Sequence, residues 1–139
     1  MADNIRGLTV EIAADATTFN KQMRELRSEA KSSQSELNAL QKSLELKFDS
    51  ATFERAQKVA QQAIDETAKA AETLRARLAF LEQSGNADTT AYKKLQTELA
   101  QTELRAQHLE QQLENINKIK FDAIAKNVSE VGNAISAAP

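Results

Sequence analysis

Three stretches of the chain carry an apolar or small residue at alternating steps of four and three, and none of them contains Gly or Pro. This spacing places one seam along one side of a helix, which is the a/d pattern of a coiled coil. In the central stretch, residues 57–81, the seam consists of Ala60, Ile64, Thr67, Ala71, Leu74, Leu78 and Leu81. The seam before it consists of Phe19, Met23, Leu26, Ala30, Ser33, Leu37, Leu40 and Leu44. The seam after it consists of Tyr92, Leu95, Leu99, Thr102, Ala106, Leu109, Leu113 and Ile116. The repeat predicts three long helices.

The side chains suit a thin helical seam better than a thick globular core. Hydrophobic residues make up 41% of the chain, but it has five Phe, one Tyr and no Trp. A helix–helix seam needs only small and medium apolar side chains. Three Gly and one Pro leave few sites for turns, which argues against a β-rich fold.

Turn and cap residues mark the ends of the predicted helices. We expect helices at about 18–46, 52–83 and 89–117, which together form a coiled-coil region at 17–117. Asp15 precedes the first helix, and Asp49 and Ser50 precede the second, as helix caps commonly do. Between the second and third helices, Gly85 can adopt a left-handed conformation and Asp88 can cap the third helix.

The start of the chain has a different period. Leu8, Val10 and Ile12 alternate with polar residues, which predicts a short β-strand within an N-terminal strand and turn at 1–16. A lone strand is not stable. Its partner would be another copy of the chain or the segment 45–48, where Leu46 and Phe48 also alternate.

After Ile116 the apolar series shifts by one residue. The new series is Phe121, Ile124, Val128, Val131 and Ile135. Such a slip indicates a kink or a separate short helix. We therefore expect a short amphipathic helical tail at 118–139 that leads into a remainder missing from this chain.

Short connections between long helices usually give antiparallel neighbours. We therefore expect an all-α fold, a long antiparallel helical hairpin or three-helix coiled coil with a short N-terminal β-strand. The competing arrangement is an extended set of helices whose seams are filled by other copies, and the heptads do not choose between the two. In both, the interaction residues are the larger seam side chains: Phe19, Met23, Leu26, Leu37, Leu40, Leu44, Ile64, Leu74, Leu78, Leu81, Leu95, Leu99, Leu109, Leu113 and Ile116.

The sequence offers little chemistry. The only histidine, His108, falls two positions after Ala106 of the seam and is expected on the solvent side. The absence of Cys excludes disulfides and thiolate metal sites, and neither a P-loop nor G-x-G-x-x-G is present. We therefore expect no enzyme, no catalytic residue, no metal and no cofactor.

The charges are mixed in sign and sum to −2, which gives no reason to expect nucleic acid. The strongest basic candidate is a spot formed by Arg24, Arg27, Lys31, Arg75 and Arg77, which we interpret as a solvated face. No apolar run approaches the roughly 20 residues of a membrane span and no signal peptide opens the chain, so we expect no membrane contact and synthesis in the cytoplasm.

Several motifs, in chain order, resemble the start of bacteriophage tail tape measure proteins. The segment 5–23, a predicted strand followed by Asp15, two Thr and Phe19, is similar to the opening of that family, and 34–37 (QSEL) and 46–49 (LKFD) resemble later segments of it. A further match consists of Gln57, Lys58, Val59, Ala63, Ile64, Thr67, Thr73 and Leu74. The segment 121–135 resembles the amphipathic segment after the coiled coil of that family.

The resemblance implies the amino-terminal part of a phage or prophage tape measure protein. Such a protein is a structural virion protein that sets tail length and organises tail tube assembly, since a helix converts residue number into distance. The implied partners are other copies of the chain, tail assembly chaperones, and tail tube and tail-end proteins, with no specific nucleic acid. The implied location is the host bacterial cytoplasm during assembly and the tail lumen of the virion afterwards.

The residues alone leave a second function open. A helical-hairpin adaptor or secreted effector module would bind a protein partner through an apolar groove between such helices. A helical DNA-binding or regulatory protein is a third option, but the basic face that it needs is absent.

Overall fold

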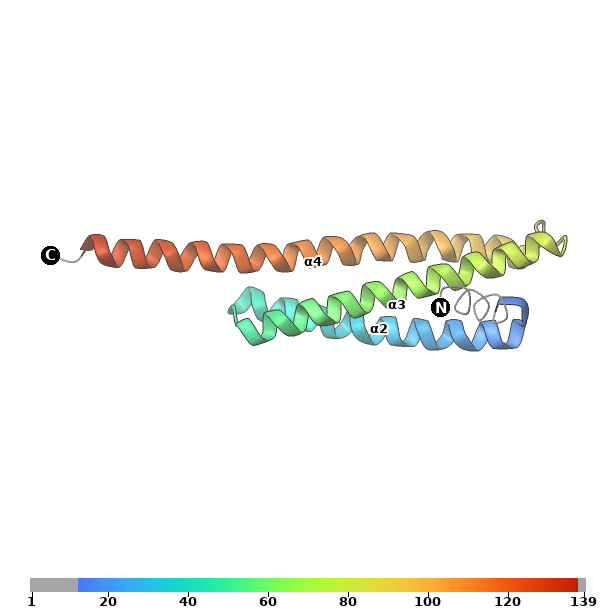
Figure 1. Ribbon diagram of the computed structural model, residues 1–139, viewed down its shortest axis with the longest axis horizontal. Coiled ribbons are helices and arrows are strands. Elements are labelled where there is room, and N and C mark those ends of the chain that lie inside the picture. The colour runs from blue at the N-terminus through green and yellow to red at the C-terminus, as the bar shows by residue number, and fades with distance from the viewer. Residues whose placement is uncertain (1–12, 138–139) are drawn as a thin grey trace, which may run out of the picture.

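The computed structural model describes residues 13–137, with side chains through Lys126, and within this range the chain is helical without any strand. The helices are α2 (Ala16–Leu46), α3 (Ser50–Gln83) and α4 (Thr90–Ala137). α3 packs along both α2 and α4, whereas α2 and α4 make little direct contact with each other. Figure 1 shows the α2–α3 hairpin with α4 running along it and continuing past the α2–α3 turn. The predicted all-α fold of three packed helices is confirmed.

Aspartates begin the first two described helices. Asp15 Oδ2 accepts a hydrogen bond from Thr18 N–H (3.3 Å) and another from the Thr18 hydroxyl. Asp49 Oδ2 accepts from Thr52 N–H (2.9 Å) and from Thr52 Oγ1 (2.9 Å). These bonds satisfy N–H groups that lack a partner in the first helical turn. They confirm both aspartates as caps.

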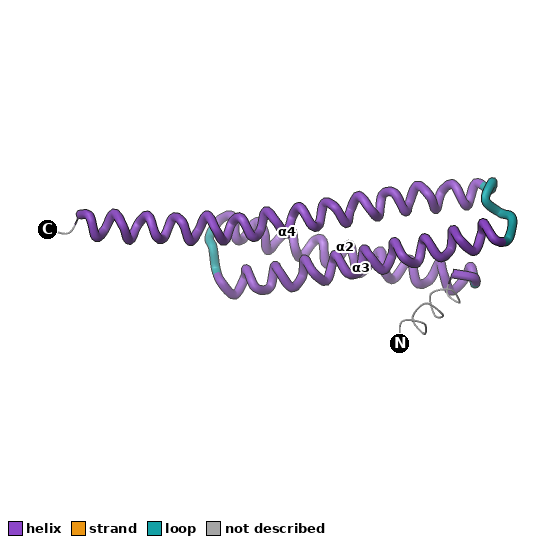
Figure 2. Tube along the Cα trace, turned by 45° about the horizontal axis from the view of Figure 1, so that its top comes forward, coloured by secondary structure: helices purple, strands orange, loops and turns teal. Residues whose placement is uncertain are grey.

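The connection between α3 and α4 is a glycine-terminated helix end (teal in Figure 2). Gly85 has φ +78°, a left-handed conformation that glycine adopts without steric cost. Asn86 N–H donates to Leu81 O (2.8 Å) and Gly85 N–H donates to Glu82 O (3.1 Å), which is the Schellman pattern. The predicted role of Asp88 is wrong, because Thr89 caps α4 by accepting from Tyr92 N–H (3.2 Å) at Oγ1.

Three clusters of buried side chains lie between the helices. The turn-end cluster, nearest the α2–α3 turn, includes Leu37, Leu44, Phe53, Ala56, Val59, Leu109 and Ile116. The second cluster consists of Phe19, Met23, Leu26, Ala70 and Leu74, with Leu95 and Leu99 packed against it. The third, near the α3–α4 turn, consists of Leu78, Leu81 and Tyr92. The seams of the three helices therefore face one another within one chain.

The described residues do not contain the predicted β element. Glu45 and Leu46 end α2, and Lys47 N–H still donates to Ser43 O (2.9 Å), so the segment 45–48 is a helix end and not a strand. The strand predicted at 8–12 lies outside the described residues.

The predicted separate helix after Ile116 is wrong, because α4 continues unbroken to Ala137. Ile119, one helical turn after Ile116, still packs against the turn-end cluster. Phe121 and Ile124 are instead 71% and 47% exposed. Phe121 and Ile124 thus form a second, exposed apolar face on a continuous helix. The helix can continue through the change of apolar face because its backbone hydrogen bonds do not depend on which face packs against a neighbour.

Candidate interaction surfaces

All the predicted interaction residues, the larger side chains of the seams, lie in or against the three clusters. The buried ones are Phe19, Met23, Leu26, Leu37, Leu44, Leu74, Leu78, Leu81, Leu109 and Ile116. The half-buried ones are Leu40, Ile64, Leu95, Leu99 and Leu113. Because this packing is internal to the chain, a partner reaches these side chains only if the helices separate. A surface for a folded partner must therefore be made of other residues.

The middle of each seam consists of small residues. Between the turn-end cluster and the second cluster lies a layer that we call the waist, made of Ala30, Ser33, Thr67, Ala71, Thr102 and Ala106. Its hydroxyls are satisfied locally: Ser33 Oγ donates to Glu66 Oε1 (2.6 Å), and Thr67 Oγ1 donates to Ala63 O (2.8 Å). Such short side chains cannot fill the space that leucines fill above and below them.

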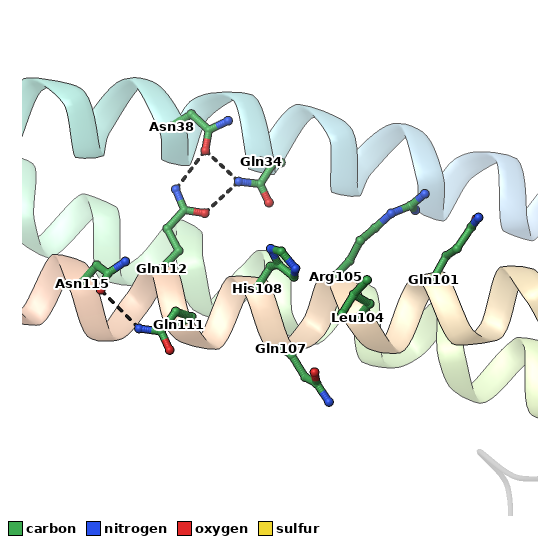
Figure 3. A pocket seen from close by; sticks show the side chains of 10 residues that line it. All are labelled: Gln34, Asn38, Gln101, Leu104, Arg105, Gln107, His108, Gln111, Gln112 and Asn115. Carbon is green, nitrogen blue, oxygen red and sulfur yellow. Dashed lines mark hydrogen bonds between the residues drawn. The ribbon is translucent and has the colours of Figure 1, made fainter.

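An open groove lies between α2 and α4 at the level of the waist. This α2–α4 groove is lined by residues within 27–38 of α2 and 101–115 of α4, with Thr67 of α3 on its floor. It consists of two adjoining hollows, of about 980 Å³ and about 480 Å³, that share Gln34 and Arg105. Figure 3 shows the larger hollow, with Arg105 and His108 extending from α4 toward α2.

A network of side-chain amides bridges one end of the groove (Figure 3). Gln112 of α4 donates from Nε2 to Asn38 Oδ1 (2.9 Å) and to Gln41 Oε1 (2.8 Å), both on α2. Its Oε1 accepts from Gln34 Nε2 (2.8 Å). Gln112 therefore joins α2 to α4 on the side where the helices otherwise make little contact.

An ion pair bridges the other end. Arg27 Nε on α2 donates to Glu98 Oε1 on α4 at 2.6 Å. Half of the Arg27 side chain remains exposed, so the pair is open to solvent and contributes little to stability. The pair connects α2 to α4 at this end of the groove.

The groove has a marked chemical bias. Among the described residues that line its two hollows, the charged ones are Arg27, Lys31 and Arg105, and none is Asp or Glu. Lys31 and Arg105 form no ion pair with any described carboxylate. The rest of the polar lining is mostly amide, and Leu104 is 54% exposed. The surface therefore offers positive charge, N–H donors and one apolar contact.

The basic spot considered from the sequence is divided among several places. Arg27 and Lys31 line the α2–α4 groove, whereas Arg75 pairs with Glu103 at 2.8 Å. Arg77 donates from Nη1 to the carbonyl oxygens of Ala13 (2.7 Å) and Ala14 (3.3 Å). No single phosphate-binding spot results from these residues.

Arg77 holds the start of the described chain against α3, a role that no pattern in the sequence predicts. Its guanidinium carbon lies 5.6 Å from the centroid of the Phe19 ring and 5.4 Å from that of Phe80. Both distances are within the range of cation–π attraction. The arginine therefore joins the backbone before α2 to aromatic rings on α2 and α3.

The end of α4 forms a second exposed surface. Leu46 is 85% exposed at the end of α2, and Phe121 and Ile124 are exposed on the part of α4 that passes the hairpin turn. Phe48 and Leu46 line a hollow together with Ile119, Ala123 and Lys126, so the turn lies beside this part of α4. We call the exposed pair Phe121 and Ile124, which do not line this hollow, the α4 end surface.

The described residues hold no group of three or more His, Cys, Asp or Glu side chains placed to bind a metal ion. His108 is exposed on the α2–α4 groove, in agreement with its expected solvent-side position. Over the same range, no helix has both the length and the apolar character needed to cross a membrane.

Comparisons with known proteins add no identity. No family model matches the chain, and no curated protein or solved structure matches it significantly.

Proposed function

We propose that the chain is the amino-terminal part of a bacteriophage or prophage tail tape measure protein, a structural protein of the virion and its assembly. In this role it organises tail tube assembly and contributes to the length of the tail. It acts by its shape and its contacts and not by catalysis.

The observation that carries the proposal is the continuation of α4 beyond the hairpin. α4 has 48 residues, which corresponds to about 72 Å at 1.5 Å per residue. The first part of α4 lies alongside α2 and α3, and the same helix then extends beyond them (Figure 1). A bundle that ends in an outgoing helix is a suitable head for a protein whose helical length measures distance.

The resemblance in the sequence supports the same proposal. The segment 46–49 (LKFD), which resembles a turn of tape measure proteins, lies at the α2–α3 connection. The partners would be other copies of the chain, tail assembly chaperones, and tube and tail-end proteins. The α4 end surface and the α2–α4 groove are the exposed surfaces on which these proteins would bind. The location would be the host cytoplasm during assembly and the tail lumen afterwards.

The test is to change the helical length in the phage that encodes the chain. Four additional heptads of helix, inserted after Lys126, should lengthen the tails by about 42 Å at 1.5 Å per residue. The control is a flexible Gly/Ser segment of the same length inserted in the turn at 84–89, which should leave tail length unchanged. Tails of unaltered length with the helical insertion, measured by electron microscopy, would contradict the proposal.

A second function is favoured by one feature, the open α2–α4 groove. A helical adaptor or secreted effector module would use such a groove to bind a partner helix. Deleting the gene separates the two functions. Heads without tails support the tape measure, whereas normal particles together with the loss of a partner interaction support the adaptor.

A further inference from the structure

A second charged surface lies on the other side of α2. This α3 strip is lined by charged residues on α2 and α3: Glu29, Lys58, Asp65, Glu66, Lys69 and Glu72. Four of these are carboxylates and two are lysines, so the strip is negative where the α2–α4 groove is positive. One molecule therefore carries two surfaces of opposite charge on different sides.

The two surfaces also match in length. The groove extends from Gln101 to Asn115 on α4, and the strip extends from Lys58 to Glu72 on α3. Each covers fourteen residue steps, which is about 21 Å of helix. A strip of this length can contact the whole groove.

The distribution of charge within each surface also matches. The cations Arg27, Lys31 and Arg105 lie at one end of the groove, and its other end carries amides such as Gln111 and Gln112. In the strip, Asp65, Glu66 and Glu72 belong to the acidic end, and Lys58, Gln61 and Gln62 lie toward the other. The cations of the groove and the carboxylates of the strip are thus each gathered toward one end, and amides lie toward the other.

The charged ends lie at the same level of the molecule. Thr67, beside the acidic end of the strip in sequence, forms a hollow together with Lys31 and Arg105. At the opposite end, Gln57 Nε2 donates to Asn117 Oδ1 at 3.0 Å, which places the start of α3 beside residue 117. Two copies that point the same way therefore align acid with cation and amide with amide.

We propose that the α2–α4 groove of one copy binds the α3 strip of a second copy, with the two molecules side by side and parallel. Lys31 and Arg105 face Asp65 and Glu72 of the second copy across this contact, and the exposed Leu104 supplies the apolar contact. Because groove and strip are different surfaces, each copy keeps one of them free. Such contacts produce rows or rings and not closed dimers. The contact depends on these two surfaces alone and does not require a role in phage tails.

Charge reversal on each surface tests the contact. The groove variant carries Lys31→Glu and Arg105→Glu, and the strip variant carries Asp65→Lys and Glu72→Lys. A matched control carries Lys42→Glu and Lys93→Glu, which make the same change of charge as the groove variant at exposed positions outside both surfaces. Sedimentation velocity at low salt measures association, and circular dichroism checks that helicity is retained.

The wild-type chain should associate with increasing concentration and dissociate as salt is raised, since salt screens exposed charges. Each reversed variant alone should associate about tenfold more weakly or not at all. An equal mixture of the two reversed variants should associate again. The unaltered strip of the groove variant fits the unaltered groove of the strip variant, and the acidic groove of the first meets the basic strip of the second. The control should behave as wild type.

Several results would overturn the proposal. The first is a wild-type chain that stays monomeric at low salt, and the second is a reversed variant that associates as strongly as wild type. The third is a mixture that associates no more strongly than either variant alone. The fourth is a control that associates as weakly as the groove variant. If the groove variant loses helicity, Lys31→Gln with Arg105→Gln removes the same positive charges without reversing them, and unchanged association would then count against the proposal.

Discussion

Replacing Leu109 by Ala is expected to destabilise the fold strongly, whereas replacing Leu104 by Ala is not. Both leucines are on α4, five residues apart, and the substitution is chemically the same at each. Leu109 is 3% exposed and belongs to the turn-end cluster with Leu37 and Ile116. Leu104 is 54% exposed on the α2–α4 groove. The pair therefore separates the effect of burial from the effect of helix propensity.

The magnitude depends on the groups removed. Leu→Ala deletes three carbons, and at about 0.8 kcal/mol for each buried carbon the lost transfer free energy is about 2.4 kcal/mol. A residual cavity adds to this, so we expect a total loss of about 3 kcal/mol at Leu109. This is a large part of the roughly 5–15 kcal/mol that stabilises a typical domain. At Leu104 the change should be within about 0.5 kcal/mol, since the side chain is mostly exposed and Ala is a good helix former.

Urea unfolding followed by circular dichroism measures the difference. The Leu109→Ala variant should unfold at a lower urea concentration with the same slope of free energy against urea, and the Leu104→Ala variant should superimpose on wild type. The measurement belongs at low protein concentration and high salt, where association does not contribute. Equal losses for the two variants would refute the placement of the α4 seam against α2 and α3.

Three further predictions concern single contacts. Asp49→Ala should lower the melting temperature near neutral pH and Asp49→Asn should not, because both Asp and Asn accept the cap hydrogen bond from Thr52. Hydrogen bonds from Thr52 hold the Asp49 pKa below its ordinary value, so this contribution is present above the unfolded-state pKa and is lost as the pH falls through the folded-state pKa. A melting temperature of Asp49→Ala that stays below wild type by the same amount through strong acid would contradict this. The Tyr92 hydroxyl donates a hydrogen bond to Glu82, and this bond raises the pKa of Tyr92. The stability that wild type gains over Tyr92→Phe should therefore be present near neutral pH and be lost as the pH rises through the raised pKa. Thermal melts of both chains across this pH range check this. Arg77→Lys keeps the charge but loses the planar guanidinium over Phe19. It should lower the free energy of unfolding, measured in urea, by about 1 kcal/mol. An unfolding curve identical to that of wild type would mean that the guanidinium contacts do not contribute to stability.

The heptads predicted α2 and α3 closely, because each of these helices keeps one apolar face along its length. The predicted ranges 18–46 and 52–83 compare with Ala16–Leu46 and Ser50–Gln83. The aspartate caps and Gly85 were also visible in the sequence, since their local chemistry allows few alternatives.

The continuation of α4 could not be read from the same pattern. The series Leu109, Leu113, Ile116 and the series that starts at Phe121 have equal spacing, and spacing alone does not tell which face finds a neighbour. The structure shows that Ile119 packs against the turn-end cluster while Phe121 is exposed where α4 passes the hairpin turn. A second apolar face on one helix therefore gave the same pattern as a break in the helix.

The α2–α4 groove was missed for a related reason. The small residues of the waist were present in all three heptad series, but only the antiparallel order of the helices brings Ala30, Thr67 and Ala106 to one level. The sequence does carry a sign of the groove, because in the middle of every seam two successive seam positions, three or four residues apart, are occupied by small residues. The contact of Arg77 with Ala13 and Ala14 left no such signal, because it joins residues more than sixty positions apart.

The central claim is that the three seams close within one chain, and cross-linking tests it most directly. The chain has no Cys, so Gln34→Cys and Gln112→Cys introduce two unique thiols on α2 and α4. In the structure Gln34 Nε2 and Gln112 Oε1 are 2.8 Å apart. A short bismaleimide should therefore link the two positions within one chain at high dilution, giving a product of monomer mass. A mixture of a tagged Gln34→Cys chain and an untagged Gln112→Cys chain should give no cross-link under the same conditions. Cross-links that form only between chains would mean that other copies fill the seams, and they would contradict the account.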